Sequence, residues 1–264
     1  MTNNQVDFGK TALDYRKHRQ GFPEEFFIRL KKLGIGVKGQ KILDLGTGTG
    51  TVARGFALAG SEVRALDPSE NLIAQAKIID QELGVTNTSY FIGTAENTQQ
   101  PDCFFDVVAA GQCWHWFDAQ KAINEIKRIL KPAGKLVVAH YDWIPAKNNI
   151  ADLTEALILK YNPEWQLKGS NGFYSRWVDQ LVDADFVNIE TCSFDVMATY
   201  THEAWRGRIR ASAGVAASLS PEKVEKFDAE FSAVLKEKFP LDPLRILHRC
   251  FMIVANLESV DITE

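Results

Sequence analysis

The sequence has few cysteines, no block of like charge and no long apolar run, and each of these absences excludes a class of protein. None of its four cysteines forms a CxxC pair or shows the spacing of metal ligands: Cys103, Cys113, Cys192 and Cys250. We therefore expect no metal and reduced, buried thiols, although Cys103 and Cys113 are close enough in sequence to be neighbours in space.

Charge and hydropathy narrow the choice of partners. The 34 acidic and 30 basic residues give a net charge of -4 and form no basic stripe, so we expect no nucleic-acid partner. No apolar run approaches the roughly 20 residues of a membrane span, and the polar start "MTNNQVDFGK" is unlike a signal peptide. We therefore expect a cytoplasmic protein that does not enter a membrane.

Length and composition are those of an ordinary globular chain. With 264 residues, 45% of them hydrophobic and 24% charged, the sequence is long enough for one domain, residues 1–264, with a full core. Short β-rich apolar runs alternate with longer amphipathic segments, which is typical of a parallel sheet covered by helices. The expected strands are 41–45, 62–66, 89–92, 105–110, 135–141, 186–196 and 244–257. The expected helices are 51–60, 69–84 and 119–131, with others near 23–33, 148–160, 174–183 and 221–238.

Residues typical of helix ends support these boundaries. Asp67 and Ser69 are placed to cap the helix expected at 69–84, and Gly84 is placed to end it. Asp118 is placed to cap the following helix, which the sequence "KPAG" (131–134) stops. The sequence therefore predicts an α/β fold with a doubly wound, mostly parallel sheet of seven strands and flanking helices.

The interval from about 142 to 185 is longer than a link between a strand and a helix requires. It also carries several large aromatic residues: Trp143, Tyr161, Trp165, Phe173, Tyr174 and Trp177. A helical insertion of this kind near the carboxyl edge of a sheet often forms a lid. A plain packed layer of helices is the alternative, and the sequence does not choose between them.

The segment "KILDLGTGTG" (41–50) places three glycines directly after the first expected strand. Alternating glycines let a ligand approach the backbone, and the following helix directs its N–H groups at that ligand. A dinucleotide requires G-x-G-x-x-G/A, which Gly48, Gly50 and Ala53 satisfy. Asp44 opposes a phosphate, because like charges ~5 Å apart in a partly buried site cost on the order of a few kcal/mol. A positively charged guest would be favoured instead.

The same loop resembles a known motif. "DLGTGTG" (44–50) is similar to the acid-x-Gly-x-Gly-x-Gly motif of class I S-adenosylmethionine-dependent methyltransferases. The resemblance continues in order through "RALDPS" (64–69), "GTAEN" (93–97) and "RILKPAGKLVVAHY" (128–141). Motifs that match in order are far more specific than a lone glycine pattern. The resemblance implies a Rossmann-like methyltransferase fold with a helical lid, and S-adenosyl-L-methionine as cofactor, with S-adenosyl-L-homocysteine as product.

The resemblance also assigns cofactor-binding residues. Asp67 stands where the family places the acid that holds both ribose hydroxyls, and Ala95 with Glu96 would border the adenine. Asp67 could also be only a helix cap, and Glu96 a solvated loop charge. The full set expected around the cofactor is Asp44, Gly46, Thr47, Gly48, Gly50, Asp67, Pro68, Ala95, Glu96, Gln112, Tyr15 and Arg19.

The substrate is expected beyond the fourth strand, at "AAGQCWHWFD" (109–118). The Asn/Asp-Pro-Pro-aromatic run of methyltransferases acting on base amines does not occur there, so we do not expect base methylation. "HWFD" resembles type 11 methyltransferases related to trans-aconitate methyltransferase. "YRKHRQGFP" (15–23) is similar to that group's entry segment, although glutamine-glycine stands where a proline is common. This implies that residues 1–34 cap the site, with Tyr15 and Arg19 close to ligand.

His115 is the catalytic candidate, as a base or as a group that orients the substrate. The alternative is a histidine that forms a hydrogen bond inside a packed turn. Trp114 and Trp116 could wall the pocket and stabilise a sulfonium by cation–π contact. Only one of the two can readily face the site, so ordinary packing is the alternative for the other.

Arg206 and Arg210 share a face if residues 202–214 form a helix. They could grip a substrate carboxylate, or form salt bridges to Glu203 and others on a solvated face. We therefore predict methyl transfer to a small-molecule acceptor, either a carboxylate or a hydroxyl, by a monomer or homodimer. The alternatives are a nicotinamide-dependent oxidoreductase and a non-catalytic S-adenosylmethionine-binding protein. The identity of the acceptor does not follow from the sequence.

Overall fold

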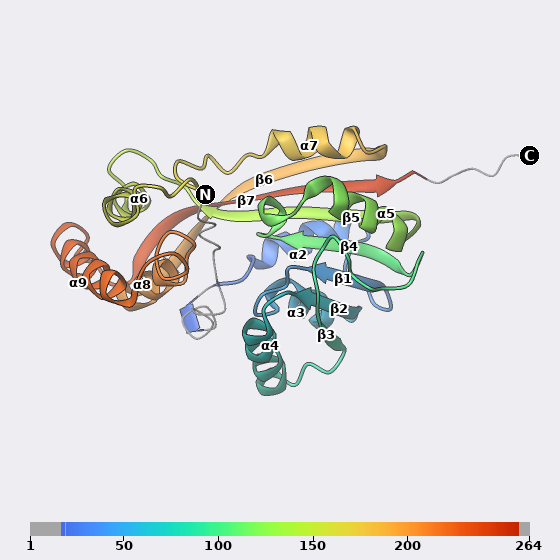
Figure 1. The fold of residues 1–264 in the computed structure, drawn as a ribbon, viewed down its shortest axis with the longest axis horizontal. Helices are drawn as coiled ribbons and strands as arrows, with labels where there is room; N and C mark the ends of the chain where they lie inside the picture. The colour runs from blue at the N-terminus through green and yellow to red at the C-terminus, as the bar shows by residue number, and fades with distance from the viewer. Residues whose placement is uncertain (1–16, 19, 259–264) are drawn as a thin grey trace, which may run out of the picture. The chain divides into compact units, whose positions relative to one another are not determined.

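A seven-stranded mixed sheet organises the chain, in a computed structural model that describes residues 17–18 and 20–258. The strand order is β3-β2-β1-β4-β5-β7-β6 (Figure 1). β1 pairs in parallel with β2 and β4, β2 with β3, and β4 with β5. The strands are β1 (Lys41–Leu45), β2 (Glu62–Asp67), β3 (Thr88–Ile92), β4 (Phe105–Gly111), β5 (Leu130–Trp143), β6 (Phe186–Tyr200) and β7 (Leu244–Leu257). The expected α/β fold with seven strands is confirmed.

Every expected strand is present, and β5 differs most from its expected bounds. It begins at Leu130, five residues before the expected start, and Leu130 pairs with Phe105 of β4. The register then shifts so that Lys135 pairs with Val107. The "KPAG" residues form this irregularity, with Ala133 at a positive φ of 59°. This segment therefore ends the helix as expected, and the structure continues it directly into the strand.

The helices lie close to their expected positions, and the caps expected from Ser69 and Asp118 are present. They are α2 (Glu24–Lys32), α3 (Thr51–Leu58), α4 (Glu70–Leu83), α5 (Ala119–Ile129), α6 (Ile150–Tyr161), α7 (Ser175–Val182), α8 (His202–Arg210) and α9 (Pro221–Lys238). Ser69 caps α4 by accepting a hydrogen bond from the Leu72 N–H, and Gly84 ends α4 in the left-handed conformation. Asp118 caps α5 by accepting from the Lys121 N–H. A short 3-10 helix, η2 (Trp114–Trp116), was not expected.

The chain divides into two compact units. We call the first the loop unit; it comprises Gly21–Tyr141, Phe173–Phe194 and the described residues from Cys250 onward. The second, the α8–α9 unit, comprises the described residues up to Gln20, Asp142–Gly172 and Asp195–Arg249. The expected insertion at 142–185 is therefore shared, because α6 belongs to the α8–α9 unit and α7 to the loop unit. A lid role for this segment stays a prediction.

The core of the loop unit lies on both faces of β1, β4 and β5. Leu43, Val108 and Leu136 are fully buried on one face together with Ile126 of α5 and Leu181 of α7. Strands buried on both faces read as continuous apolar runs, which is why the parallel strands were recognisable in the sequence. The carboxyl ends of β1, β2 and β4 consequently meet at one edge, which positions the segments described below.

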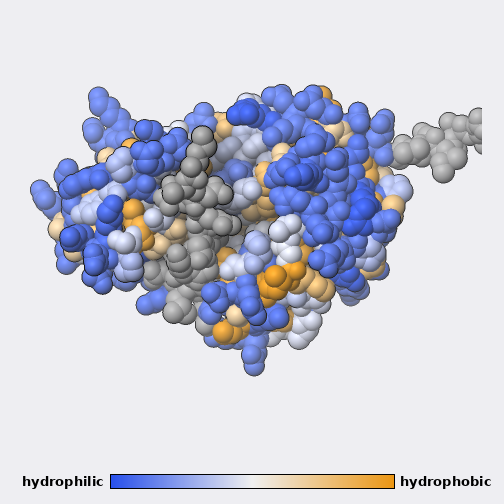
Figure 2. Space-filling view, in the orientation of Figure 1, coloured by the Kyte–Doolittle hydropathy of each residue, from blue (hydrophilic) through white to orange (hydrophobic). Residues whose placement is uncertain are grey.

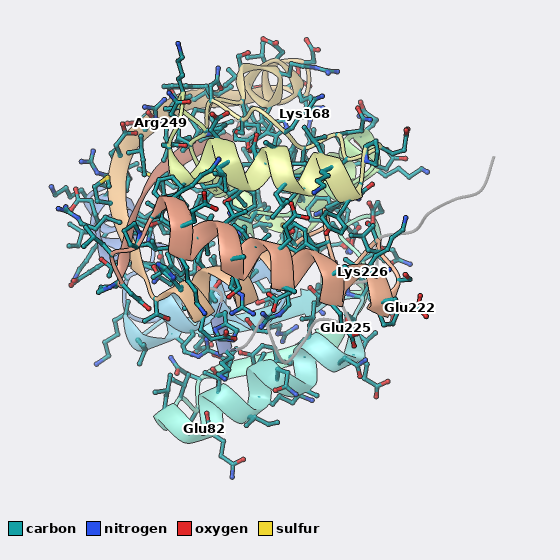
Figure 3. All side chains as sticks on the ribbon, turned by 90° about the vertical axis from the view of Figure 1, so that its left-hand side faces the viewer. Glu82, Lys168, Glu222, Glu225, Lys226 and Arg249 are labelled. Carbon is teal, nitrogen blue, oxygen red and sulfur yellow. The ribbon has the colours of Figure 1, made fainter. Side chains whose placement is uncertain are left out.

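The α8–α9 unit has its own core. Phe227, Phe231 and Leu235 repeat at four-residue spacing along α9 and are fully buried with Trp205 and Ile209 of α8. This spacing places all three α9 side chains on one face of the helix. The opposite face is charged, and Figure 3 shows Glu222, Glu225 and Lys226 on the outer side of α9.

The visible surface is mostly hydrophilic, with hydrophobic colour concentrated where β3 and α4 lie (Figures 1 and 2). The exposed large apolar side chains of these two elements are Ile78, Leu83, Phe91 and Ile92. β3 is an edge strand, so its exposed apolar residues follow from its position in the sheet. Within residues 17–18 and 20–258, no helix is both long and apolar enough to span a bilayer.

All four cysteines are free. Cys113 and Cys250 are buried as expected, and Cys192 is half-buried. The expectation is wrong for Cys103, which is exposed because it lies in the turn before β4 with a φ of 47°. In the part of the chain that the structure describes, no three His, Cys, Asp or Glu side chains are grouped so that they could hold a metal ion.

Candidate functional site

The glycine loop follows β1 and leads into α3. Gly46, Gly48 and Gly50 have φ values of 59°, 58° and 80°, a region that favours glycine. Two of the three also have no room for a side chain. A Cβ at Gly46 would lie 2.7 Å from the Cβ of Cys113, and one at Gly50 would lie 2.5 Å from the Tyr90 hydroxyl. The loop therefore requires glycine for both its conformation and its packing.

Asp44 holds the loop from the β1 side. Its Oδ2 accepts hydrogen bonds from the Thr47 hydroxyl at 2.6 Å and from the Ala53 N–H at 3.1 Å. The side chain is 1% exposed. Burial raises the pKa of Asp44 to about 7, against the opposing effect of these two hydrogen bonds, and the nearby Asp67 raises it further. Asp44 thus joins the loop to the first turn of α3 and brings a carboxyl group into a buried position.

Asp67 holds the loop from the end of β2. Its Oδ2 accepts from the Gly48 N–H at 2.8 Å, and its Oδ1 accepts from the Ser69 N–H at 2.8 Å. Burial raises the pKa of Asp67, and the two backbone hydrogen bonds partly offset that effect. The N-cap of α4 is Ser69, so Asp67 is not itself the cap. Since a carboxylate has about four lone-pair sites, it retains capacity to accept from ligand hydroxyls.

A buried polar network lies behind the loop, and sequence reasoning missed it. Arg54 of α3 pairs with Asp80 of α4, with its Nε 2.6 Å from Oδ1, and donates to the Thr49 carbonyl at 3.0 Å. The Tyr90 hydroxyl of β3 donates to the other oxygen of Asp80 at 2.7 Å and contacts Gly50. These residues support the loop from α3, α4 and β3. The only residue of this network that the sequence could have indicated is Arg54, because it is a charged residue inside an otherwise apolar helix segment.

The segment after β3 is linked to the start of α5. Glu96 Oε1 accepts a hydrogen bond from the Asp118 N–H at 2.9 Å, which gives this carboxylate a structural role. Ala95 is buried and Pro68, which follows Asp67, is exposed. These residues lie after β3 and β2, at the same edge of the sheet as the glycine loop.

The segment after β4 turns sharply. Gln112 has a φ of 60°, its N–H donates to the Ala139 carbonyl at 2.8 Å, and its side-chain amide donates to the Tyr141 carbonyl. Trp114 is 2% exposed and donates its indole N–H to Gln180, within the core of the loop unit. Trp116 is 44% exposed. Trp114 is therefore a core residue, whereas Trp116 lies at the surface.

His115 forms part of a chain that includes two residues sequence reasoning did not assign to the site. Its Nδ1 lies 3.1 Å from Nε2 of His140, and Nδ1 of His140 lies 3.1 Å from the Tyr174 hydroxyl. We call these three residues the His–His–Tyr chain. Ala139 of β5 pairs with Gly111 of β4, and His140 is the next residue. Aligning the carboxyl ends of these two strands in the sequence could therefore have indicated that His140 lies near His115. The sequence marked Tyr174 only as one of several aromatic residues in the insertion at 142–185.

Arg206 and Arg210 lie on α8, in the α8–α9 unit. Both guanidinium groups pair with Asp228 of α9, and both approach Glu203 at 3.3 Å. They therefore share a face, as expected, and the salt-bridge alternative describes their contacts. Arg208 is 8% exposed and stacks over the Trp143 ring at 5.0 Å. Tyr15 and Arg19 lie outside the described residues.

Comparisons with known proteins agree with this geometry. Residues 43–138 match the family model described as a methyltransferase domain. The chain is 33% identical over 146 residues to an uncharacterized methyltransferase, YcgJ, of Bacillus subtilis, covering 52% of this chain and 55% of that protein. It spans about half the length of the first curated relatives it matches.

Solved structures show the same fold. A putative type II methyltransferase from Anaeromyxobacter dehalogenans has a TM-score of 0.65 at 20% identity, over 91% of this chain and 98% of that one. A phosphoethanolamine N-methyltransferase from Haemonchus contortus, in complex with S-adenosylhomocysteine, has a TM-score of 0.58 at 20% identity, over 97% of this chain and 61% of that one. Residues 43–138 are therefore similar to the methyltransferase domain family, and the chain shares the fold of these solved methyltransferases.

Proposed function

We propose that this protein transfers a methyl group from S-adenosyl-L-methionine to a small-molecule acceptor. The observation that carries the proposal is the glycine loop held between two buried carboxyl groups, Asp44 and Asp67. When they are ionised, these two carboxyl groups make the surroundings of the loop negative. A sulfonium and an ammonium group are favoured there, and a pyrophosphate is disfavoured.

The residues around the loop fit this cofactor. Glycine at positions 46, 48 and 50 leaves the loop backbone without side chains there, and Asp67 has lone pairs for the two ribose hydroxyls. The remaining residues proposed to line the cofactor are Thr47, Gly48, Pro68, Ala95, Glu96, Gln112, Tyr15 and Arg19. When bound, S-adenosylmethionine supplies a methyl group activated by its positively charged sulfur. The protein supplies alignment and exclusion of water.

A small-molecule acceptor is supported by the absence of a basic stripe in the sequence and by the phosphoethanolamine methyltransferase among the similar folds. Trp116, exposed after β4, is the proposed aromatic wall of the acceptor pocket. The resemblance of "HWFD" to proteins related to trans-aconitate methyltransferase is a finer prediction, and it would favour a carboxylate acceptor. A cytoplasmic location and a monomeric or dimeric state also stay predictions.

A nicotinamide-dependent oxidoreductase is the second candidate, because Gly48, Gly50 and Ala53 satisfy the dinucleotide spacing. The buried Asp44 opposes it. A protein that binds S-adenosylmethionine without transferring a methyl group is the third. Only detection of a methylated product separates it from an enzyme.

Calorimetric titration of the purified protein with S-adenosylmethionine, S-adenosylhomocysteine and NAD tests the proposal. We expect micromolar binding of the first two and none of NAD. The matched control is Asp106→Asn, which changes a carboxylate of the same sheet that lies at the start of β4, and it should leave the affinity unchanged. Binding of NAD alone, or of none of the three, would overturn the proposal.

A further inference from the structure

The interior of α8 contains a glycine, Gly207, that is buried. Glycine inside a helix lowers the stability of the helix relative to alanine, so a glycine at such a position usually has a packing reason. A Cβ at Gly207 would lie 2.1 Å from Cδ2, 2.4 Å from Cγ and 2.7 Å from Nε2 of His18. The imidazole ring of His18 therefore lies directly against the α8 backbone, and only glycine leaves room for it there.

His18 and Gln20 both dock on the α8–α9 unit, to which they belong. His18 is 7% exposed, so its side chain is almost fully covered. Rotation about the bond between Cβ and Cγ does not move Cγ, so an added Cβ at Gly207 would displace the whole ring. The Gln20 side-chain amide donates a hydrogen bond to the Thr199 carbonyl, near the end of β6, at 2.6 Å. Two contacts thus fix this part of the chain on one unit.

The next two residues of the chain pack against segments of the loop unit. A Cβ at Gly21 would lie 3.2 Å from the Cβ of Thr51, the first residue of α3, which directly follows the glycine loop. A Cβ at Gly111, the last residue of β4, would lie 3.1 Å from the Phe22 ring. Gly21 and Phe22 therefore lie against the start of α3 and the end of β4, the two segments that border the candidate cofactor site.

We call residues 18 and 20–22 the strap. We infer that Gly207 and His18 are positioning residues, which hold the strap in place for cofactor binding. The inference rests on the proposed methyltransferase function and deepens it. A strap that is already docked on α8 does not have to be ordered when the cofactor binds at the glycine loop, so docking raises the affinity by removing that entropic cost. By linkage, a bound cofactor should hold the strap on α8 more firmly.

Limited proteolysis of the ligand-free protein tests the docking. Trypsin can cleave after Lys17, whose side chain is exposed, when the adjoining strap leaves α8, because cleavage tracks the population of the opened chain. Mass spectrometry measures the rate at which the chain is cut after Lys17. We expect Gly207→Ala to raise this rate about tenfold over wild type. A rate equal to that of wild type would overturn the inference, because alanine otherwise only favours the helix.

A matched control separates the contact from a general loosening of the α8–α9 unit. Gly214 lies in the same unit, and a Cβ there would lie 2.7 Å from Cγ2 of Ile158. Gly214→Ala therefore introduces a comparable clash with a different side chain, and it should leave the cleavage rate after Lys17 unchanged. An increase equal to that of Gly207→Ala would overturn the inference.

The contact can also be removed from its other side. His18→Ala deletes the ring without adding an atom to α8, so it should release the strap and speed cleavage after Lys17 by itself. In the double variant, Gly207→Ala should then add nothing, because its Cβ no longer meets a ring. A further increase in the double variant would place the effect in α8 itself and would overturn the role of His18.

Calorimetry with S-adenosylmethionine tests the link between the strap and the cofactor. We expect Gly207→Ala and His18→Ala each to weaken binding about fivefold or more, and Gly214→Ala to keep the wild-type affinity. Wild-type affinity in both strap variants, together with faster cleavage, would overturn the positioning role. Absence of binding to the wild-type protein would instead overturn the proposed function. Because the cleavage assay needs no cofactor, the two failures are distinguishable.

Discussion

Replacing Asp44 with asparagine should remove a pH-dependent loss of stability that the wild-type protein carries. An ordinary aspartate has a pKa of about 3.9, and burial raises that of Asp44 to about 7. The folded protein therefore holds this proton more tightly than the unfolded chain does. The resulting contribution to the free energy of unfolding is complete below about pH 4 and is lost as the pH rises through 7.

The size of the effect follows from the shift. Each unit of pH between the two pKa values changes the free energy of unfolding by about 1.4 kcal/mol. The wild-type free energy of unfolding minus that of Asp44→Asn should therefore fall by about 3 kcal/mol between pH 5 and pH 8. Asparagine can still accept from Thr47 and Ala53, and any fixed cost of burying its amide shifts the difference equally at every pH.

Urea unfolding of both proteins at half-unit steps of pH measures this difference. Asp106→Asn is a control of opposite sign: burial raises the Asp106 pKa, but hydrogen bonds from Lys131 and the Lys41 N–H outweigh burial and lower it. For Asp106→Asn, the wild-type free energy of unfolding minus that of the variant should therefore rise with pH in the acid range. An Asp44 difference that stays constant from pH 5 to pH 8, or that increases, would refute the buried-carboxyl argument.

Three further predictions concern the loop and the second unit. Asp67→Ala should weaken S-adenosylmethionine binding by about 1–3 kcal/mol, because the ribose hydroxyls lose a charged partner and Gly48 loses its hydrogen bond; a calorimetric affinity within twofold of wild type would contradict this. Gly48→Val should abolish that binding, since a β-branched residue does not tolerate a φ of 58°, and normal affinity in the same assay would disprove the loop assignment. Burial lowers the pKa of His248 to about 4, so stability is lost as the pH falls from about 6.5 through 4. His248→Phe should remove about 2 kcal/mol of that loss between pH 7 and pH 5. A wild-type-minus-variant difference in the free energy of unfolding in urea that stays constant over this pH range would contradict it.

The succession of strands and helices along the chain and the position of the glycine loop could be predicted from the sequence. Residues close together in the sequence are sufficient to specify these features. Alternating glycines, a capping Ser69, a terminal Gly84 and continuous apolar strands each specify their structure within a few residues. Because parallel strands end at one edge, the sequence also placed Asp44, Asp67 and His115 at the same edge of the sheet.

The side chains that complete the candidate site could not be predicted in this way, because long-range packing selects them. Trp114 and Trp116 are two residues apart, yet one is buried and the other exposed, because the turn of η2 directs them differently. Arg54 meets Asp80 through the packing of two helices. His115, His140 and Tyr174 lie on three segments distant in sequence, and only the packing of α7 against the sheet brings the tyrosine to the histidines. Periodicity and spacing record local geometry, whereas contacts of this kind depend on where distant segments pack in the fold.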